Sequence, residues 1–347
     1  MDTINVLIAT KLEEVFQRQI ADVDRRVKVY DAADLINAEW VREPGIEASA
    51  EAHKELDGLL REAEIIVLSR PPRELSHHSS TLSDLLSRAT NLKWIQYTGA
   101  GMDRMAILGL LDGNFTVTNA SGNSAVPIAE YVLCVMLMFA RKALLYFLNK
   151  QEKRWDRYTS SELMGKTLGI VGLGSIGQEV ARRAKAFGMR LVATKRSSVG
   201  SEPAVMMADK VYPRQDLLEM LAECDFVVIS APLTRETAGM IGERELKAMK
   251  PSAFLINIAR GGLIDEAVLI RALKEGWIAG AGLDVFQREP LPTESELWEM
   301  PNVIISSHNS GTTGMNSVRL TGLFCENLKR YIAGQPLLNV VSQERGY

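Results

Sequence analysis

Short apolar runs rich in β-branched residues alternate along the chain with segments whose apolar residues recur at helical spacing. In the first third of the chain, five of these runs predict strands: residues 5–10, 27–32, 64–69, 92–99 and 115–120. The segments between them, such as residues 56–63, have the amphipathic pattern of helices. A series in which strands and helices alternate is typical of a parallel sheet covered by helices.

A second series of the same kind begins near residue 167. Its predicted strands are uninterrupted apolar runs: residues 167–172, 190–194, 226–230, 253–258, 281–285 and 302–307. Such runs are expected for parallel strands that are buried on both faces. One long apolar helix, from about Ser124 to Asn149, is predicted between the two series, and a last helix over residues 317–334 can return to the first. We therefore predict an α/β protein with two doubly wound parallel-sheet domains.

Length, composition and charge narrow the class of protein. The 347 residues are enough for two domains, and the net charge of −3 gives no general attraction to nucleic acid or anionic membranes. Three cysteines scattered among apolar neighbours predict buried thiols in a reducing compartment. The N-terminus lacks the pattern of a signal peptide, and the longest apolar stretch, residues 131–140, is shorter than the roughly 20 residues of a spanning helix. We therefore predict a cytoplasmic protein with no membrane or nucleic-acid partner.

A glycine-rich turn follows the first strand of the second series. Gly172, Gly174 and Gly177 form the pattern GxGxxG, and a good helical segment begins directly after it. An ordinary glycine turn gives the same pattern, but the strand before it and the helix after it favour a dinucleotide site. In such a site the pyrophosphate lies at the helix N-terminus, close to the glycine backbone.

Two cations lie about 20 residues further on, at a place where NAD-binding chains normally have Asp or Glu. Lys195, Arg196 and Ser197 occupy this position. A carboxylate there would accept hydrogen bonds from the ribose of NAD, whereas Lys and Arg suit the 2′-phosphate of NADP. A solvated basic turn is the alternative. We predict NADP(H) as the cofactor, with NAD bound more weakly.

Four ionic side chains follow apolar runs of the second series: Arg260, Asp284, Glu289 and His308. Taken singly, each has an ordinary explanation as a surface charge, a turn cap or a loop residue. The carboxyl ends of parallel strands meet at one sheet edge, however, and ligands bind there in open α/β folds. Together with the glycine turn, these residues therefore predict a site for hydride transfer.

The chemistry of the four side chains fits a 2-oxo or 2-hydroxy acid. Arg260 can bind the substrate carboxylate through paired hydrogen bonds, and His308 has the right chemistry to exchange a proton with the substrate oxygen. Glu289 can orient the imidazole and favour its protonated form. Asp284 can accept a hydrogen bond from the nicotinamide amide. The other three histidines show no ligand spacing, so we predict no metal.

Several long motifs in a fixed order extend this interpretation to a family. The segments are ELMGKTLGIVGLGSIG, PLTRETAGMI, LINIARGGLIDEAVLIRAL, AGLDVFQREPLP and SSHNSG, together with YTGAGMD near residue 100. With these motifs the chain resembles the D-isomer-specific 2-hydroxyacid dehydrogenase family over essentially its whole length. The resemblance implies a Rossmann NAD(P)-binding domain, residues 119–312, inserted into a flavodoxin-like substrate-binding domain made of residues 1–118 and 313–347.

The resemblance also implies roles for particular residues. Arg260, Glu289 and His308 match the family's catalytic residues, and the acid would also contact Gly99, Ala100 and Gly101. The implied cofactor-binding residues are Gly172, Gly174, Ser175, Ile176, Gly177, Lys195, Arg196, Ser197, Ala231, Pro232, Ile258, Arg260, Asp284, His308 and Gly311. The family's usual dimer arm corresponds to the apolar helix that starts at Ser124, which implies a homodimer. A Trp near the position of Trp155 reaches the partner's cleft in some relatives.

Some positions depart from the family pattern. Ser306 and Ser307 precede His308 where Thr-Pro is common, and Ser230-Ala231 stand where a His is frequent. Glu289 argues against a formate dehydrogenase, which has Gln at this place. The shape of residues 70–76 and 97–103 decides which acid fits, so the acid stays open.

The expected activity is reduction of glyoxylate, hydroxypyruvate or a similar 2-oxo acid with NADPH. A non-enzymatic NAD(P)-sensing scaffold or corepressor with the same fold is the main alternative, although the chain shows no long tail for docking other proteins. A phosphoglycerate dehydrogenase working in the oxidative direction is a third option. The pair Lys195-Arg196 favours reduction over this option, and nothing in the sequence resembles a regulatory domain.

Overall fold

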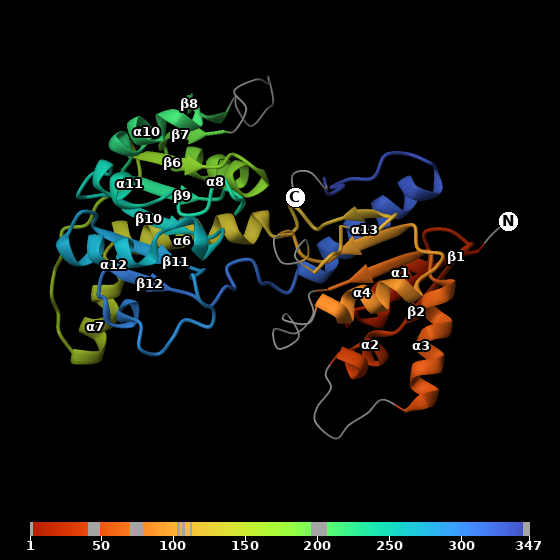
Figure 1. Cartoon of the computed structure of the whole chain (residues 1–347). Helices are drawn as coiled ribbons and strands as arrows, with labels where there is room; N and C mark the ends of the chain where they lie inside the picture. The colour runs from red at the N-terminus through yellow and green to blue at the C-terminus, as the bar shows by residue number, and fades with distance from the viewer. Residues whose placement is uncertain are drawn as a thin grey trace. The chain divides into compact units, whose positions relative to one another are not determined.

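The chain divides into two compact units. A computed structural model describes residues 3–40, 49–69, 79–102, 105, 108–111, 113–195 and 207–342. Unit 1 consists of Met1–Asn123 and Gly314–Tyr347, and unit 2 consists of Ser124–Thr313. The colours of Figure 1 show that unit 1 contains both ends of the chain, with α13 in blue beside the red and orange elements. The predicted boundaries, after residues 118 and 312, fall near these divisions.

Unit 1 has a five-stranded parallel sheet in the order β2-β1-β3-β4-β5. Its strands are β1 (Ile4–Ala9), β2 (Val27–Asp31), β3 (Ile65–Leu68), β4 (Trp94–Tyr97) and β5 (Thr116–Thr118). Its helices are α1 (Glu14–Ala21), α2 (Ala33–Trp40), α3 (Ala50–Glu62), α4 (Ser79–Arg88) and α13 (Asn316–Ile332). Strands β3 and β4 are buried throughout, so they form the centre of the unit, and α13 packs against α1. The strand order is the flavodoxin-like one that the sequence predicts.

Unit 2 has a seven-stranded parallel sheet in the order β12-β11-β10-β9-β6-β7-β8. The strands are β6 (Thr167–Val171), β7 (Arg190–Thr194), β8 (Lys210–Tyr212), β9 (Phe226–Ile229), β10 (Phe254–Asn257), β11 (Gly280–Leu283) and β12 (Val303–Ile305). The helices are α6 (Ala125–Ala140), α7 (Ala143–Glu152), α8 (Ser175–Ala186), α10 (Leu217–Glu223), α11 (Glu243–Ala248) and α12 (Glu266–Glu275). The order reverses beside β6, which is the Rossmann arrangement and the place where nucleotides bind in such sheets. Two parallel-sheet α/β units therefore confirm the predicted fold class.

Local sequence signals explain the helices that matter for the site. Asp265 caps the start of helix α12, because its side chain accepts a hydrogen bond from the Val268 N–H, and Gly276 caps the end in the left-handed conformation (φ 70°). Helix α6 has no such caps, and apolar packing holds it instead. The ring of Phe139 stacks on that of Phe254 in β10, with centroids 4.4 Å apart. Helix α6 is therefore fixed to the sheet of unit 2 (Figure 1).

The prediction of one long helix from Ser124 to Asn149 is wrong. The helix ends at Ala140, and Lys142 adopts the left-handed conformation (φ 54°) before α7 begins. The backbone N–H of Ser161 donates to the Ala140 carbonyl at 2.9 Å, so a distant segment takes the acceptor that a continuing helix would use. No glycine or proline marks this break, and for that reason the local pattern does not show it.

Among the described residues, no single helix has the length and apolar character needed to cross a membrane. Helices α6 and α7 reach that length and apolar character only when they are taken together, and the pair is bent by 64° at the break between them.

Candidate active site

The glycine turn lies between β6 and α8, and packing explains two of its three glycines. Gly172 has φ 100°, and a Cβ there would lie 2.7 Å from the backbone nitrogen of Ala231. A Cβ on Gly177 would lie 2.5 Å from the Gly172 carbonyl oxygen. Any side chain at these places would push the turn away from β6 or from the segment after β9, so glycine is required.

Gly174 is glycine for another reason. Its φ is −83°, which any residue adopts, and a Cβ there would meet no atom within 4 Å. Neither backbone strain nor contact with the protein therefore excludes a side chain. In a Rossmann dinucleotide site a phosphate approaches the first turn of the helix closely, and a side chain at this position would stand in its way. This position fits the pyrophosphate of a dinucleotide, and the predicted neighbours Ser175 and Ile176 form the first residues of α8.

Lys195 lies at the same sheet edge as the glycine turn. Strand β7 pairs Thr194 with Val171 of β6, and the Gly172 N–H donates to the Thr194 carbonyl oxygen at 3.2 Å. Lys195 is the next residue and is half-buried. Arg196 and Ser197, predicted beside it, lie outside the described residues.

Arg260 follows β10 and is held by the side chain of Asn257. The Asn257 Oδ1 accepts from the Ala259 N–H at 3.1 Å, and its Nδ2 donates to the Arg260 carbonyl oxygen at 2.9 Å. The Arg260 Nη1 donates to the Ala259 carbonyl oxygen at 2.8 Å. Because Asn257 is only 1% exposed, its two hydrogen bonds compensate its burial and fix the turn that carries Arg260.

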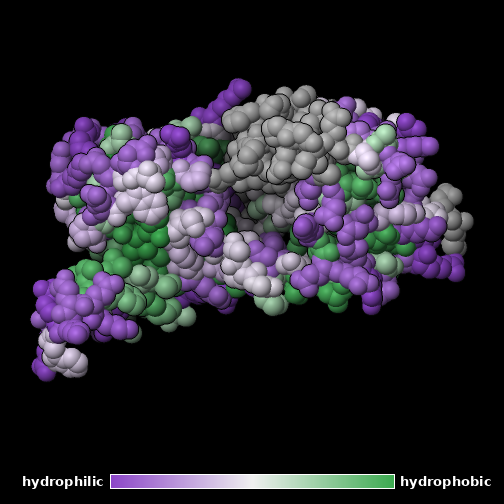
Figure 2. All heavy atoms as spheres, turned by 90° about the horizontal axis from the view of Figure 1, so that it is seen from below, coloured by the Kyte–Doolittle hydropathy of each residue, from purple (hydrophilic) through white to green (hydrophobic). Residues whose placement is uncertain are grey.

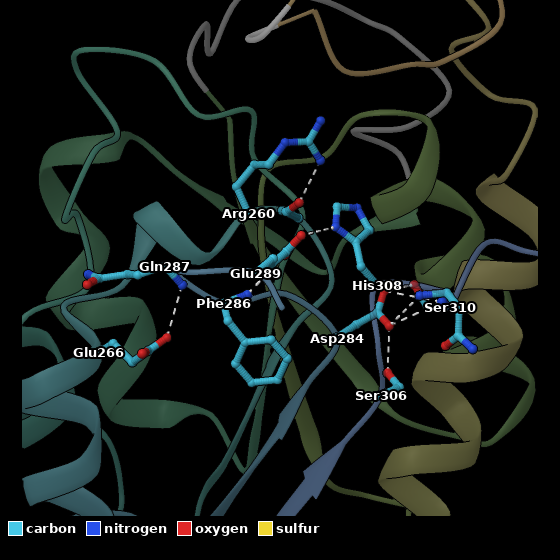
Figure 3. Close-up of polar contacts among 11 residues, drawn as sticks. Arg260, Glu266, Asp284, Phe286, Gln287, Glu289, Ser306, His308 and Ser310 are labelled. Carbon is cyan, nitrogen blue, oxygen red and sulfur yellow. Dashed lines mark hydrogen bonds and ion pairs between the residues drawn. The ribbon is translucent and has the colours of Figure 1, made fainter. Parts of the chain in front are cut away.

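A close backbone contact joins the Arg260 turn to the loop after β11. A Cβ on Gly261 would lie 1.9 Å from the carbonyl carbon of Phe286. Gln287 adds two bonds across the same contact: its Nε2 donates to the Ile264 carbonyl oxygen and its N–H donates to Glu266. The loop that ends in Glu289 is therefore held against the segment that follows Arg260 (Figure 3).

His308 and Glu289 form a hydrogen-bonded pair. The His308 Nδ1 lies 2.9 Å from the Glu289 Oε2, and the other oxygen of Glu289 accepts from the Phe286 N–H at 3.2 Å. The side chains are 32% and 20% exposed, so a small molecule can reach them. An ionised carboxylate only accepts, so Nδ1 carries a hydrogen and Nε2 is the atom that can exchange a proton with a ligand. Figure 3 shows the guanidinium of Arg260 and the imidazole of His308 pointing to the same region.

Asp284 lies at the end of β11 and is 1% exposed. Both of its carboxylate oxygens accept hydrogen bonds from the loop that contains His308; the donors are Ser306, Asn309 and Ser310 (Figure 3). In the structure, this carboxylate holds the histidine loop. The contact with the nicotinamide amide that the sequence predicts stays a prediction.

The remaining predicted residues are distributed over both units. Ala231, Pro232 and Ile258 follow β9 and β10 at the carboxyl edge of the unit 2 sheet, and a Cβ on Gly311 would lie 2.9 Å from the Cβ of Ser124. Gly99, Ala100 and Gly101 belong to unit 1. There the Asn119 Nδ2 donates to the Ala100 carbonyl oxygen at 3.0 Å. Within the described residues, no cluster of three or more His, Cys, Asp or Glu is arranged to hold a metal ion.

The fold and the site define a class of protein: a Rossmann-type α/β chain with a glycine turn after β6 and a hydrogen-bonded His–Glu pair in the same unit. A family model described as "D-isomer specific 2-hydroxyacid dehydrogenase, NAD binding domain" matches residues 133–310. The chain is 37% identical over 270 residues to the glyoxylate reductase of Thermococcus gammatolerans, an alignment that covers 75% of this chain and 79% of the relative. The chain therefore belongs to the D-isomer specific 2-hydroxyacid dehydrogenase family, as its motifs predict.

Other relatives have longer chains. The D-3-phosphoglycerate dehydrogenase of Methanocaldococcus jannaschii is 36% identical over 261 residues, and the alignment covers 75% of this chain but 49% of that one. This chain thus spans about half the length of that relative.

Solved structures agree with the family assignment. The D-isomer specific 2-hydroxyacid dehydrogenase of Xanthobacter autotrophicus, in complex with NADPH and MES, matches with a TM-score of 0.79 and 27% identity over 100% of both chains. The NADPH-dependent glyoxylate/hydroxypyruvate reductase of Sinorhizobium meliloti, in complex with NADP and sulfate, matches with a TM-score of 0.78 and 27% identity, covering 99% of this chain and 100% of that one. The chain is an oxidoreductase of this family, with an NAD-binding domain.

Proposed function

We propose that this protein reduces a small 2-oxo acid to the D-2-hydroxy acid with NADPH, and that glyoxylate and hydroxypyruvate are in its substrate range. The hydrogen bond between His308 and Glu289, next to the Arg260 turn, is the observation that carries the proposal. The chain's similarity to glyoxylate reductases supports the choice of acid.

The three side chains have separate tasks in this reaction. Arg260 binds the carboxylate of the acid and thereby orients its 2-oxo carbon. The Nε2 of His308 donates a proton to the 2-oxo oxygen, while Glu289 holds the imidazole by its Nδ1 and stabilises its positive charge. NADPH, when bound, would supply the hydride for the 2-oxo carbon. In the opposite direction, His308 takes the hydroxyl proton from the 2-hydroxy acid.

Preference for NADPH rests on the edge between β6 and β7. Lys195 stands one residue beyond Thr194, where Rossmann geometry places the adenosine ribose, and Arg196 follows in the sequence. Hydrogen bonds between charged groups contribute about 1.5–3 kcal/mol each. Two such contacts to a 2′-phosphate, reduced by solvent screening, correspond to roughly a 100-fold preference for NADPH over NADH.

The test compares kcat/KM for NADPH and NADH on the parent protein and on a variant with Lys195→Asp and Arg196→Ala. We expect the parent to prefer NADPH, with the preference falling as salt screens the attraction between the cations and the phosphate, and the double variant to prefer NADH. Lys54→Asp together with Arg61→Ala is the matched control, because the pair makes the same charge change at exposed positions of α3 in unit 1. A parent that uses NADH equally well or better would contradict the proposed coenzyme.

A non-enzymatic, nucleotide-sensing role is the alternative function. The partly exposed pair of His308 and Glu289 favours an enzyme, since binding NADP(H) alone requires no acid–base pair at the substrate position. Turnover of NADPH across a panel of 2-oxo acids separates the two functions. A protein that binds NADPH tightly but turns over none of the panel would support the sensing role.

A further inference from the structure

The loop that carries His308 is built around one buried carboxylate. Asp284 accepts hydrogen bonds from the hydroxyls of Ser306 and Ser310 and from the backbone N–H groups of Asn309 and Ser310. The N–H of His308 itself donates to the Asp284 carbonyl oxygen at 2.8 Å. The place of the imidazole therefore depends on the place of Asp284.

The backbone at His308 needs this support. Its φ is 53°, in the left-handed region that non-glycine residues adopt only where surrounding contacts hold them. The loop contacts supply such support on both sides of the histidine: Ser306 precedes it, and Asn309 and Ser310 follow it. Removing one of the contacts releases part of the constraint on the imidazole.

The hydroxyl of Ser306 connects the carboxylate to helix α6. The Ser306 Oγ lies 2.7 Å from the Tyr131 hydroxyl and also bonds to the Asp284 Oδ1. A serine hydroxyl has one hydrogen, and an ionised carboxylate can only accept. Ser306 therefore donates to Asp284, and its oxygen accepts from Tyr131. Burial raises the pKa of Tyr131 above its ordinary value, so this hydroxyl keeps its proton.

Tyr131 projects from a rigid element. Helix α6 lies so close to β11 that a Cβ on Gly282 would be 2.6 Å from the Val135 Cγ1. The stack of Phe139 on Phe254 fixes the next turns of the helix. The chain of hydrogen bonds from Tyr131 through Ser306 to Asp284 thus begins at a fixed point of the core.

We propose that Tyr131 and Ser306 are positioning residues for His308: through Asp284 they fix the imidazole in the orientation that proton transfer needs. The proposal rests on the proposed function, since it takes His308 as the proton donor. Both residues act on the loop from within the protein, so their loss is expected to slow the reaction more than it weakens binding of the acid.

The experiment removes single hydroxyls. Tyr131→Phe and Ser306→Ala are expected to lower kcat about tenfold or more. A small displacement of a catalytic group can slow a reaction by about 100-fold. The KM of the acid is expected to change little. Ser306→Thr keeps the hydroxyl and is expected to keep most of the parental kcat. Tyr331→Phe is the matched control, because it removes a tyrosine hydroxyl that bonds to Glu64 in unit 1.

A second readout does not require turnover. The chain has four histidines, so the imidazole NMR signals of His308 can be identified by their loss in His308→Ala. We expect these signals to shift or broaden in Tyr131→Phe and to stay unchanged in Tyr331→Phe. If the parent reduces no 2-oxo acid, the proposed function fails, and the NMR comparison still tests the positioning.

Parental kcat together with parental His308 signals in Tyr131→Phe would overturn the proposal. If Tyr131→Phe does not fold, the two Ser306 variants carry the test. Equal kcat and equal His308 signals in Ser306→Ala and Ser306→Thr would then overturn it.

Discussion

The pair of His308 and Glu289 makes the sharpest prediction at the scale of single residues. His308→Ala removes the proton donor, and general acid catalysis typically contributes 10²–10⁴-fold in rate, so kcat is expected to fall on the order of 100-fold or more. Glu289→Gln keeps the shape of the side chain but removes the charge that supports the imidazolium, so it is expected to cause a smaller loss. The measurement is kcat with NADPH and one good 2-oxo acid.

His53→Ala is the control for this comparison, because His53 is exposed on α3 in unit 1. It is expected to keep the parental kcat. A folded His308→Ala protein whose kcat matches that of His53→Ala would remove His308 from the reaction.

The sequence reveals the candidate site residues more readily than the residues that hold them in place. Arg260, Glu289 and His308 stand out because ionic side chains follow apolar runs. Tyr131 does not stand out, since it lies in an apolar helix and its partner Ser306 is 175 residues away. Its proposed role depends on the burial of Asp284, which only the folded chain shows. A polar residue at the end of an apolar run, such as Asn257, is the one sequence signal that points to a supporting residue of this kind.

At the scale of elements, the contact between the Arg260 turn and the loop after β11 can be tested with glycine variants. A Cβ at Gly261 would lie 1.9 Å from the Phe286 backbone, so Gly261→Ala must displace one of the two segments. Overpacking of this kind typically costs about 1–3 kcal/mol of stability. We expect a lower Tm together with a lower kcat, since the loop carries Glu289.

Gly262→Ala is the matched control. A Cβ there would meet only the ends of the Leu233 side chain, at 3.3 Å, and a side chain can move where a backbone cannot. We expect little change in Tm or kcat. Equal effects of the two substitutions would mean that the close approach at Gly261 does not hold the site together.

Strands were easier to predict than the ends of helices. Each predicted apolar run overlaps a strand of the structure, because parallel strands buried on both faces need continuous apolar sequence. Strand β8 (Lys210–Tyr212) is not predicted, because it is not an apolar run: its first residue is an exposed lysine and only its last residue is buried. The break between α6 and α7 was missed because a tertiary contact at Ser161 ends the helix.

At the scale of the whole molecule, the chain leaves unit 1 after Asn123 and returns to it at Gly314. The predicted last helix, residues 317–334, corresponds to α13, which packs against α1 in unit 1. That unit 2 binds the coenzyme and unit 1 the acid remains a proposal. It agrees with the glycine turn in unit 2 and with the family's NAD-binding model, which matches residues 133–310.

An apolar surface on unit 2 leads to a prediction of assembly. Helix α7 exposes Tyr146, Phe147 and Leu148, and Phe147 is 62% exposed. On the outer face of α6 lies an open groove of about 530 Å³ whose lining includes Leu137 and Phe187. Figure 2 shows hydrophobic surface on the half of the molecule that contains unit 2. Apolar surface of this kind on one face is typical of a protein–protein interface.

We therefore expect a homodimer that buries α7 and the outer face of α6, since two-fold dimers are the commonest assemblies. Light scattering at micromolar concentration is expected to give twice the mass of the 38.4 kDa chain. Phe147→Glu places a charge on this surface and is expected to shift the protein toward the monomer. Val15→Glu is the control, because Val15 is 61% exposed on α1 in unit 1. A monomeric parent would contradict the dimer. It would also contradict the predicted role of Trp155, which is 92% exposed, because that role requires the cleft of a partner subunit.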